Sequence, residues 1–364
     1  MPQTFATERA APTDARTQPS NRFAVLHAYP DPEIEAKWLE CLAHADAPQH
    51  FASPAFFLEP YFAEKKPFAV LALEDGDVTG ILTGLHDRKT VVSGLETRVH
   101  IAVDQRRDPQ EALRRLVEGV ELESRGAKLV QIYSWRRLPL DPFVQAGYRK
   151  REFPGNPVFD LSLGAEALIK RFGKSQRHNV RLAKKSGVEI VEATSREQFE
   201  EFYAIYEKWC GVKQTAQFSK AVEWAAFQNT RANRAYFLAM HEGKSIAGSV
   251  IRFYPGGLIE CSRNSSLPEF RNLKPNDLLI AHTIEWGCAH GFQRISLGAH
   301  HKFLRGFGGE ITPIDRYRAD RTVLRRHDLR DFAGDSARAV MHRLPQTWQQ
   351  RIRRILHGEK AAGW

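Results

Sequence analysis

The segment KPNDLLIAHTIEWGCAHGFQRISLG, Lys274 to Gly298, decides the predicted fold. It predicts a helix that ends at Gly291, followed by the strand QRISLG. Two stretches before it, RAYFLAMHEGKSIAGSVIRF (residues 234–253) and GLIECSRN (residues 257–264), predict two strands joined at a glycine turn and then a third strand. This part of the chain therefore reads as a sheet crossed by a helix.

The same order of elements occurs once before in the chain. FAVLALEDGDVTGILTG (residues 68–84), TVVSG (90–94) and RVHIAVD (98–104) predict strands, DPQEALRRLVEGVELESRG (108–126) a helix, and KLVQIYSW (128–135) a further strand. Gly126 and Gly291 end the two helices 165 residues apart, which indicates a duplicated domain and not a short repeat. We therefore predict an α/β (α+β) fold of two tandem domains, residues 23–165 and 166–322, each a twisted mixed sheet flanked by helices.

Composition narrows the class of protein. The chain has 364 residues, 42% of them hydrophobic, and 53 basic against 43 acidic residues give a net charge of +10. This excess favours an anionic partner. The four cysteines form no CxxC pair, which argues against a zinc site or a disulfide framework and favours a reducing cytoplasm. Residues 1–22 are expected to be a disordered tail without a secretory signal. Residues 323–364 are expected to be a basic helical extension, docked on its own domain or touching the inner surface of a membrane.

A run of 22 residues without an acid, Ala167 to Val188, contains RFGKSQRHNVRLAKKSG (residues 171–187). Its cations recur at spacings of three and four, so a helix would carry them along one edge. Such an edge is either a solvated face or an anion-binding element. The candidate ligands are a nucleotide-sugar diphosphate, a lipid pyrophosphate or an RNA backbone.

Three segments resemble known families. Residues 265–298, SSLPEFRNLKPNDLLIAHTIEWGCAHGFQRISLG, resemble the core of the GNAT acyltransferase superfamily, in which a helix N-terminus holds the pyrophosphate of an acyl donor. LGAHHKFLRGFGG (297–309) resembles the His-Lys-x-x-Arg-Gly-Phe signature of the FemAB-like proteins, and SQRHNVRLAKKSGVEI (175–190) is similar to their basic helix. FemAB-like enzymes have two GNAT-type domains in tandem. They typically move an amino acid from aminoacyl-tRNA to a cell-wall peptide precursor, and related members use acyl-CoA.

The resemblance implies catalytic residues on the glycine-containing loop after the last strand. An acyl transfer to an amine passes through a tetrahedral oxyanion, which fixed cations stabilise. Lys302 and Arg305 are the candidates for this role, and His301 is a candidate general base. The alternatives are a basic turn that returns the chain to the fold, and a histidine that is packed or solvated.

Further residues are candidates for binding. Arg177, Asn179 and Arg181 best match the basic-helix pattern and are expected to bind the substrate, as are Arg263 and Asn264 on the predicted strand GLIECSRN. Glu260 on the same strand is a weaker candidate for orienting an amine. Arg271, Lys274 and Asn276 are candidates for the donor phosphates, and plain helix capping is the alternative. The loop EFRNLKPNDLL has no glycine, unlike the Arg/Gln-x-x-Gly-x-Gly/Ala loop of the GNAT superfamily.

These features lead to one functional prediction and its alternatives. We predict a cytoplasmic acyltransferase that moves an acyl or aminoacyl group onto an amine of an anionic cell-envelope precursor, which is peptidoglycan, polysaccharide or lipid-linked. The donor is acyl-CoA or aminoacyl-tRNA, and no metal is expected. The alternatives are an acyl-CoA-dependent acetyltransferase of a small-molecule or sugar amine, and a non-catalytic module that binds phosphorylated precursors. No GxSxG, HExxH or GxxxxGK[ST] pattern supports a hydrolase, a metalloprotease or a kinase.

Overall fold

The computed structural model describes residues 22–343, apart from residues 63, 137, 139, 229–232 and 300. The expected tail up to residue 21 and the end of the basic extension, residues 344–364, lie outside the described residues. Within them, no helix has both the length and the apolar character needed to cross a bilayer.

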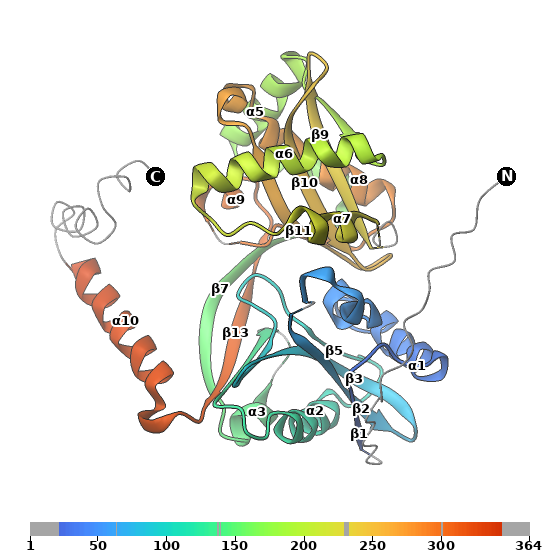
Figure 1. The fold of residues 1–364 in the computed structure, drawn as a ribbon, viewed down its shortest axis with the longest axis vertical. Coiled ribbons are helices and arrows are strands. Elements are labelled where there is room, and N and C mark those ends of the chain that lie inside the picture. The colour runs from blue at the N-terminus through green and yellow to red at the C-terminus, as the bar shows by residue number, and fades with distance from the viewer. Residues whose placement is uncertain are drawn as a thin grey trace.

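Two α/β units lie one above the other in Figure 1. The elements of the first unit are β1 (Phe23–Leu26), α1 (Pro32–Ala43), the 3-10 helices η1 (His50–Ala52), η2 (Pro54–Leu58) and η3 (Pro60–Phe62), β2 (Lys66–Glu74), β3 (Asp77–Asp87), β4 (Thr90–Ser93), β5 (Ile101–Val103), α2 (Pro109–Glu123), β6 (Leu129–Trp135), α3 (Asp141–Gln145) and β7 (Arg149–Asp160). Asp108 caps α2, and its side chain accepts a hydrogen bond from the Gln110 amide at 2.9 Å.

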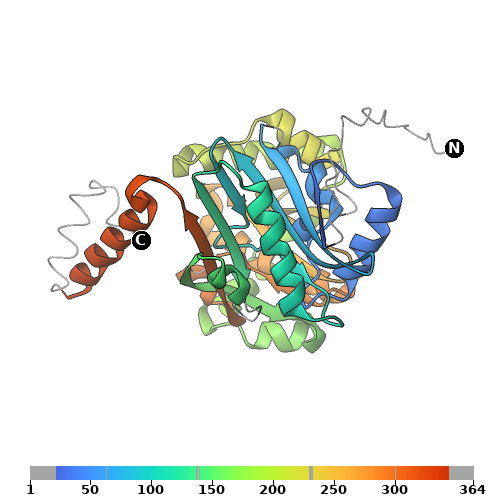
Figure 2. The same ribbon diagram turned by 90° about the horizontal axis from the view of Figure 1, so that it is seen from below.

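The second unit repeats this order. Its elements are η4 (Leu161–Leu163), α4 (Ala165–Lys170), α5 (Lys174–Lys185), β8 (Glu189–Glu192), α6 (Arg196–Lys213), α7 (Lys220–Gln228), β9 (Arg234–His241), β10 (Lys244–Phe253), β11 (Leu258–Ser266), η5 (Pro268–Leu273), α8 (Pro275–Ala289), β12 (Arg294–Ser296), α9 (Lys302–Arg305) and β13 (Glu310–Asp320). The helix α10 (Arg326–Arg343) follows η6 (Val323–Arg325). Its Asp331 pairs with Arg151 of β7 and Arg318 of β13, and the helix extends away from both units beyond this point (Figures 1 and 2). The cationic run therefore does form a helix, α5.

In the described part of the chain, thirteen strands belong to one sheet, with the order β1-β2-β3-β4-β6-β13-β7-β12-β11-β10-β9-β8 and β5 beside β3. The two ends of the sheet have the same arrangement. From β1 inward the strands are antiparallel up to β4, which is parallel to β6, and from β8 inward they are antiparallel up to β11, which is parallel to β12. The parallel strands are joined through α2 in the first unit and through α8 in the second. The predicted duplication is thus confirmed. The two halves of the one continuous sheet have the same strand arrangement.

The last strand of each unit completes the sheet of the other. β7 follows the first unit in the chain but pairs with β12, where Asp160 is opposite Arg294. β13 follows the second unit but pairs with β6, where Trp135 is opposite Ile314. The two long strands also pair with each other and join the units (Figure 1). This exchange fixes the two units relative to each other, so residues from both can form one site.

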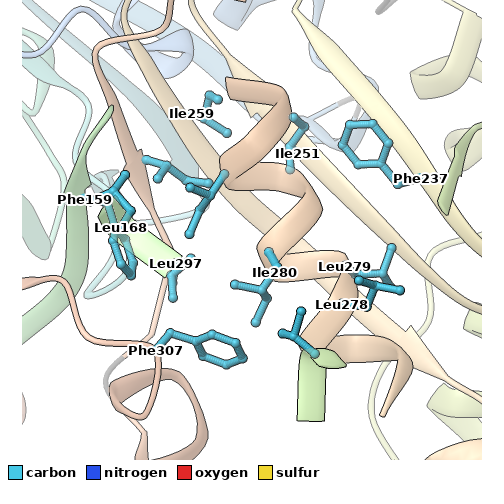
Figure 3. Packing of buried hydrophobic residues seen from close by; sticks show 14 of the residues in the cluster. Phe159, Leu168, Phe237, Ile251, Ile259, Leu278, Leu279, Ile280, Leu297 and Phe307 are labelled. Atoms are coloured by element: carbon cyan, nitrogen blue, oxygen red, sulfur yellow. The ribbon is translucent and has the colours of Figure 1, made fainter. Parts of the chain in front are cut away.

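Helices cover both faces of each half of the sheet. In the second unit α8 is buried on nearly all sides, as expected of a helix that is apolar all round. Figure 3 shows Leu279 and Ile280 of this helix with Ile251 and Ile259 of the strands. The opposite face packs against α6, through Phe199 and its neighbours. In the first unit α2 lies across the sheet (Figure 2), and α1 packs on the other face.

Candidate active site

The site lies where the parallel strands β11 and β12 part. They are paired only from Leu258 with Arg294 to Glu260 with Ser296. After Ser296 the strand β12 ends, whereas β11 continues to Ser266. A cavity of about 400 Å³ opens in this wedge, and its walls come from both units and from the segment at α9. The lining residues are Phe51, Thr97, Arg98, Trp209, Arg252, residues 260–264, Asn276, residues 297–299, His301, Phe303 and Leu304.

The matching place in the first unit is closed. There β4 ends at Ser93 and the chain turns at Gly94, whose φ of +81° suits glycine. Val99, Tyr133 and Trp135 pack together with Leu258 and Ile314 at this point. The first unit keeps a smaller cavity of about 270 Å³ beside β5, the start of α2 and the end of β6, and it is lined by that unit alone.

A β-bulge arranges the polar side chains of β11. Opposite β10, Arg252 pairs with Glu260 and Ile251 with Cys261, but Val250 pairs with Arg263. Ser262 is thus an extra residue. Because of the bulge, Glu260 and Arg263 face the same side of the sheet although they are three residues apart, while Ile259 and Cys261 face the core around α8.

Glu260 is a buried acid in this cavity. Its side chain is 7% exposed, and its Oε2 has no hydrogen-bond partner among the described residues. Burial raises the pKa of Glu260 to about 7, although Arg98 and Arg252 act to lower it. A carboxylate whose pKa is near neutrality can take a proton from an amine and release it again. The weaker candidate of the sequence is thus the group best placed for acid–base chemistry.

A second buried carboxylate, Glu59, holds the two units together behind the cavity. It forms a close ion pair with Arg234 and a hydrogen bond with His50, and its Oε1 lies 4.0 Å from the Arg252 Nε. Burial alone would raise the pKa of Glu59, but Arg252 and then His50 and Arg234 lower it overall. Glu59 therefore stays ionised and helps to fix Arg252 beside Glu260.

Four of the predicted site residues meet in the cavity: Arg263, Asn264, Asn276 and His301. Arg263 lies 2.8 Å from the buried Glu223 and over the ring of Tyr206. Asn276 donates to the Ser266 Oγ at 3.1 Å. The side-chain oxygens of Asn264 and Asn276 have no partner in the described part of the chain. Two amide oxygens are therefore free to accept hydrogen bonds from a ligand.

Lys302 and Arg305 are exposed on α9 and do not line the cavity. Their neighbours do: His301 and Phe303 are cavity residues, so α9 borders the opening. Phe307 is fully buried and anchors the segment, whereas Phe303 is 36% exposed. The two cations thus stand beside the cavity on a short anchored helix.

The predicted substrate residues of α5 lie outside the cavity. Arg177 donates to the Lys170 carbonyl at 2.8 Å and so caps the end of α4. Asn179 donates to the Asp277 carboxylate at 3.1 Å, while Arg181 is exposed. The start of α5 is nevertheless close to α9, because the Gly173 amide donates to the Gly306 carbonyl at 2.8 Å.

The N-terminus of α8 does not fit the pyrophosphate of an acyl-CoA. Pro275 begins the helix and has no amide hydrogen, and Lys274 before it has a left-handed backbone with φ of +57°. Asp277 places a buried carboxylate in the first turn, where a phosphate would gain from the helix dipole. Burial raises the pKa of Asp277, and Asn179 opposes this shift. Arg271 and Lys274 do not line the cavity either.

Sequence reasoning missed several residues of the site: Phe51, Arg98, Trp209 and Arg252. A charged residue inside the apolar strand SVIRF was a signal for Arg252. Nothing in the sequence indicated that Arg98, in a loop of the first unit, would reach the second.

No group of three or more potential metal ligands occurs among the residues that the structure describes.

Comparison with known proteins agrees with this architecture. Residues 170–306 match the family model of the acetyltransferase (GNAT) domain. The structure of FemX superposes with a TM-score of 0.61 at 12% identity, covering 78% of this chain and 94% of that chain. A tandem GNAT protein from the clavulanic acid biosynthesis pathway gives 0.53 at 16% identity, covering 83% and 98%. L-PGS from Bacillus licheniformis gives 0.52 at 14% identity, covering 81% and 93%. None of the curated protein sequences compared matches the chain.

The family match identifies an acyltransferase domain of the GNAT type at residues 170–306. The chain as a whole shares its fold with FemX and with the tandem GNAT protein.

Proposed function

We propose that the protein moves an aminoacyl or other acyl group onto an amine of an anionic cell-envelope precursor, in the cavity between β11 and β12. The observation that carries this proposal is Glu260, a buried carboxyl with a free Oε2 and a pKa near 7 in that cavity. The fold shared with FemX and with L-PGS from Bacillus licheniformis supports the envelope as the setting.

In the proposed reaction the acceptor amine attacks the carbonyl carbon of the donor ester. Glu260 takes one proton from the amine as the new C–N bond forms, and the carbonyl oxygen becomes an oxyanion. The bond to the leaving oxygen then breaks, and Glu260 returns the proton to that oxygen, which regenerates the carboxylate. Lys302 stabilises the oxyanion from the edge of the cavity, Arg305 assists it, and His301 orients the acceptor.

Aminoacyl-tRNA suits the proposed donor better than acyl-CoA. The N-terminus of α8 already holds Asp277, which would repel a pyrophosphate. Exposed cations continue from α9 onto α5, since Gly306 and Gly173 are hydrogen-bonded neighbours. Lys174 and Arg181 are exposed on α5 and make no ion pair in the described structure. Such a surface suits a long phosphate backbone. Arg177 and Asn179 would shape it, while Arg271 and Lys274 add charge at its edge.

A transfer assay with labelled donors tests this proposal. The purified protein is incubated with precursors extracted from cell envelopes and with either radiolabelled aminoacyl-tRNA or radiolabelled acetyl-CoA. We expect label to pass to a precursor amine from aminoacyl-tRNA, and the product to be identified by mass spectrometry. Transfer from acetyl-CoA alone would favour the second candidate, an acyl-CoA-dependent acetyltransferase, and would reject the proposed donor.

A further inference from the structure

Two arginines from different units lie over the same aromatic ring in the cavity. The Arg98 guanidinium is 4.3 Å from the centre of the Phe51 ring, and the Arg252 guanidinium is 5.1 Å from it. Arg98 belongs to the loop between β4 and β5 of the first unit, whereas Arg252 belongs to β10 of the second. The ring holds both guanidiniums in place through cation–π contacts.

Both arginines have unused hydrogen-bonding capacity. The Nε atoms of Arg98 and Arg252 are buried and have no acceptor among the described residues. Arg98 makes no ion pair in the described structure, and the nearest carboxylate that Arg252 reaches is Glu59 at 4.0 Å. A buried N–H group without an acceptor costs free energy, so an arginine kept in this state is expected to meet its acceptor in a ligand.

The charges around the two arginines do not cancel. Among the described residues, Arg98, Arg252 and Arg234 face two carboxylates, Glu59 and Glu260, and Arg263 is already matched by Glu223. The cavity floor thus keeps an excess of positive charge even when Glu260 is ionised. One small oxyanion would neutralise this excess and supply acceptors to both guanidiniums.

We propose that Arg98 and Arg252 form a subsite for a carboxylate or phosphate group carried by the acceptor amine itself. The inference rests on the proposed function, because it takes Glu260 as the group that receives the amine. The amine lies against Glu260, and the carboxylate or phosphate of the acceptor lies against the arginines over Phe51. The acceptor is therefore a short amine with an acidic group nearby, and the first unit selects it through Arg98.

Binding of small probes tests the subsite without any donor. The probes are O-phosphoethanolamine and β-alanine, which carry an amine and a phosphate or a carboxylate, with ethanolamine and propionate as probes that lack one of the two groups. Isothermal titration calorimetry on the full chain is expected to show binding of at least one of the two complete probes. Which one binds distinguishes phosphate from carboxylate. No binding of either complete probe, or equal binding of ethanolamine, would overturn the proposal.

Variants locate the binding. Arg98→Gln is expected to weaken the complete probe at least tenfold, because one charged donor pair is lost, and to unfold at or above the wild-type temperature. Arg125→Gln, an exposed arginine of the same unit, is the control and should bind normally. Equal binding by Arg98→Gln contradicts the subsite, and so does an equal loss in Arg125→Gln. Arg98→Lys, which keeps the charge but not the planar fork, should bind with intermediate affinity and replaces Arg98→Gln if that variant does not fold.

The test of the subsite can fail or succeed independently of the test of the transfer reaction. Binding that depends on Arg98 without any transfer would reject the proposed function and keep the subsite. If the Arg98→Gln variant catalyses transfer with an unchanged acceptor KM, the subsite is rejected and the proposed function is kept.

Discussion

Arg252 and Glu260 are cross-strand partners on β10 and β11, and both side chains are buried in the wall of the cavity. Side chains directly opposite each other on antiparallel strands lie on the same face of the sheet. The pair therefore brings a cation and an acid together at the place where β11 leaves β12. Both the acid–base chemistry and the charge of the site depend on this relationship.

The buried Glu260 should make stability depend on pH. Its pKa is about 7 in the folded protein and 4.5 in a solvated carboxyl, so the folded state holds the proton more tightly. As pH rises from about 4.5 to about 7, the wild type should lose about 3 kcal/mol relative to Glu260→Gln. Urea unfolding of both proteins at several pH values measures this difference. A constant difference across the range would show that Glu260 is not held in its neutral form.

Removal of the charge of Glu59 should destabilise the protein strongly. Glu59→Gln leaves Arg234 and Arg252 buried without their carboxylate, and a broken buried ion pair costs about 3–5 kcal/mol. Glu40→Gln is the matched control, because Glu40 is exposed and pairs with Arg106 on the surface. It should cost less than about 1 kcal/mol. Equal unfolding free energies of the two variants would mean that the cluster contributes little.

Lys302 should matter for turnover and not for binding. Lys302→Met keeps much of the apolar stem and removes the charge, so kcat should fall about 100-fold, equivalent to about 2.7 kcal/mol in the barrier. Acceptor KM should change far less, because the oxyanion exists only in the transition state. Lys244→Met, at an exposed position of the same unit, serves as control. Near-normal kcat in Lys302→Met would end the assignment of Lys302 to catalysis.

The basic helix α5 should set the salt dependence of tRNA binding. Each phosphate contact that is lost reduces the slope of log affinity against log salt by about one. The double variant Lys174→Gln/Arg181→Gln should therefore bind tRNA more weakly at low salt and with a smaller slope. Lys37→Gln on α1 removes a charge far from α5 in the chain and should leave the slope unchanged. Filter binding over a salt series measures all three proteins, and an unchanged slope in the double variant would exclude α5 as the contact.

The helices, the strands and the duplication of the domain could be predicted from the sequence. The strands and helices around Gly126 and Gly291 follow from alternation, capping and glycine signals, which are local. The exchange of β7 and β13 does not follow, because a strand pairs through its backbone and the partner can be distant in the chain. For the same reason the two predicted domains proved to share one sheet.

The candidate site was predictable only in part. Arg263, Asn264, Asn276 and His301 were found because they lie on motifs next to the predicted strand ends. Glu260 was weighted too little, since its importance depends on burial, which a strand sequence does not show. The bulge at Ser262 and the reach of Arg98 from the first unit are tertiary features without a local signal. Arg177 illustrates the opposite case: it matches a family pattern, yet its hydrogen bond is to the carbonyl of Lys170.

The rate of transfer by Glu260→Gln tests the central claim most directly. With labelled aminoacyl-tRNA and the acceptor found in the transfer assay, kcat is measured from about pH 5.5 to about pH 9. The wild-type rate should rise with pH and level off above about 7, where Glu260 is ionised. Glu260→Gln should be slower by about 100-fold or more at the plateau and should lose this rise. A variant that keeps the wild-type rate and the same pH dependence would contradict acyl transfer at this cavity with Glu260 as the base.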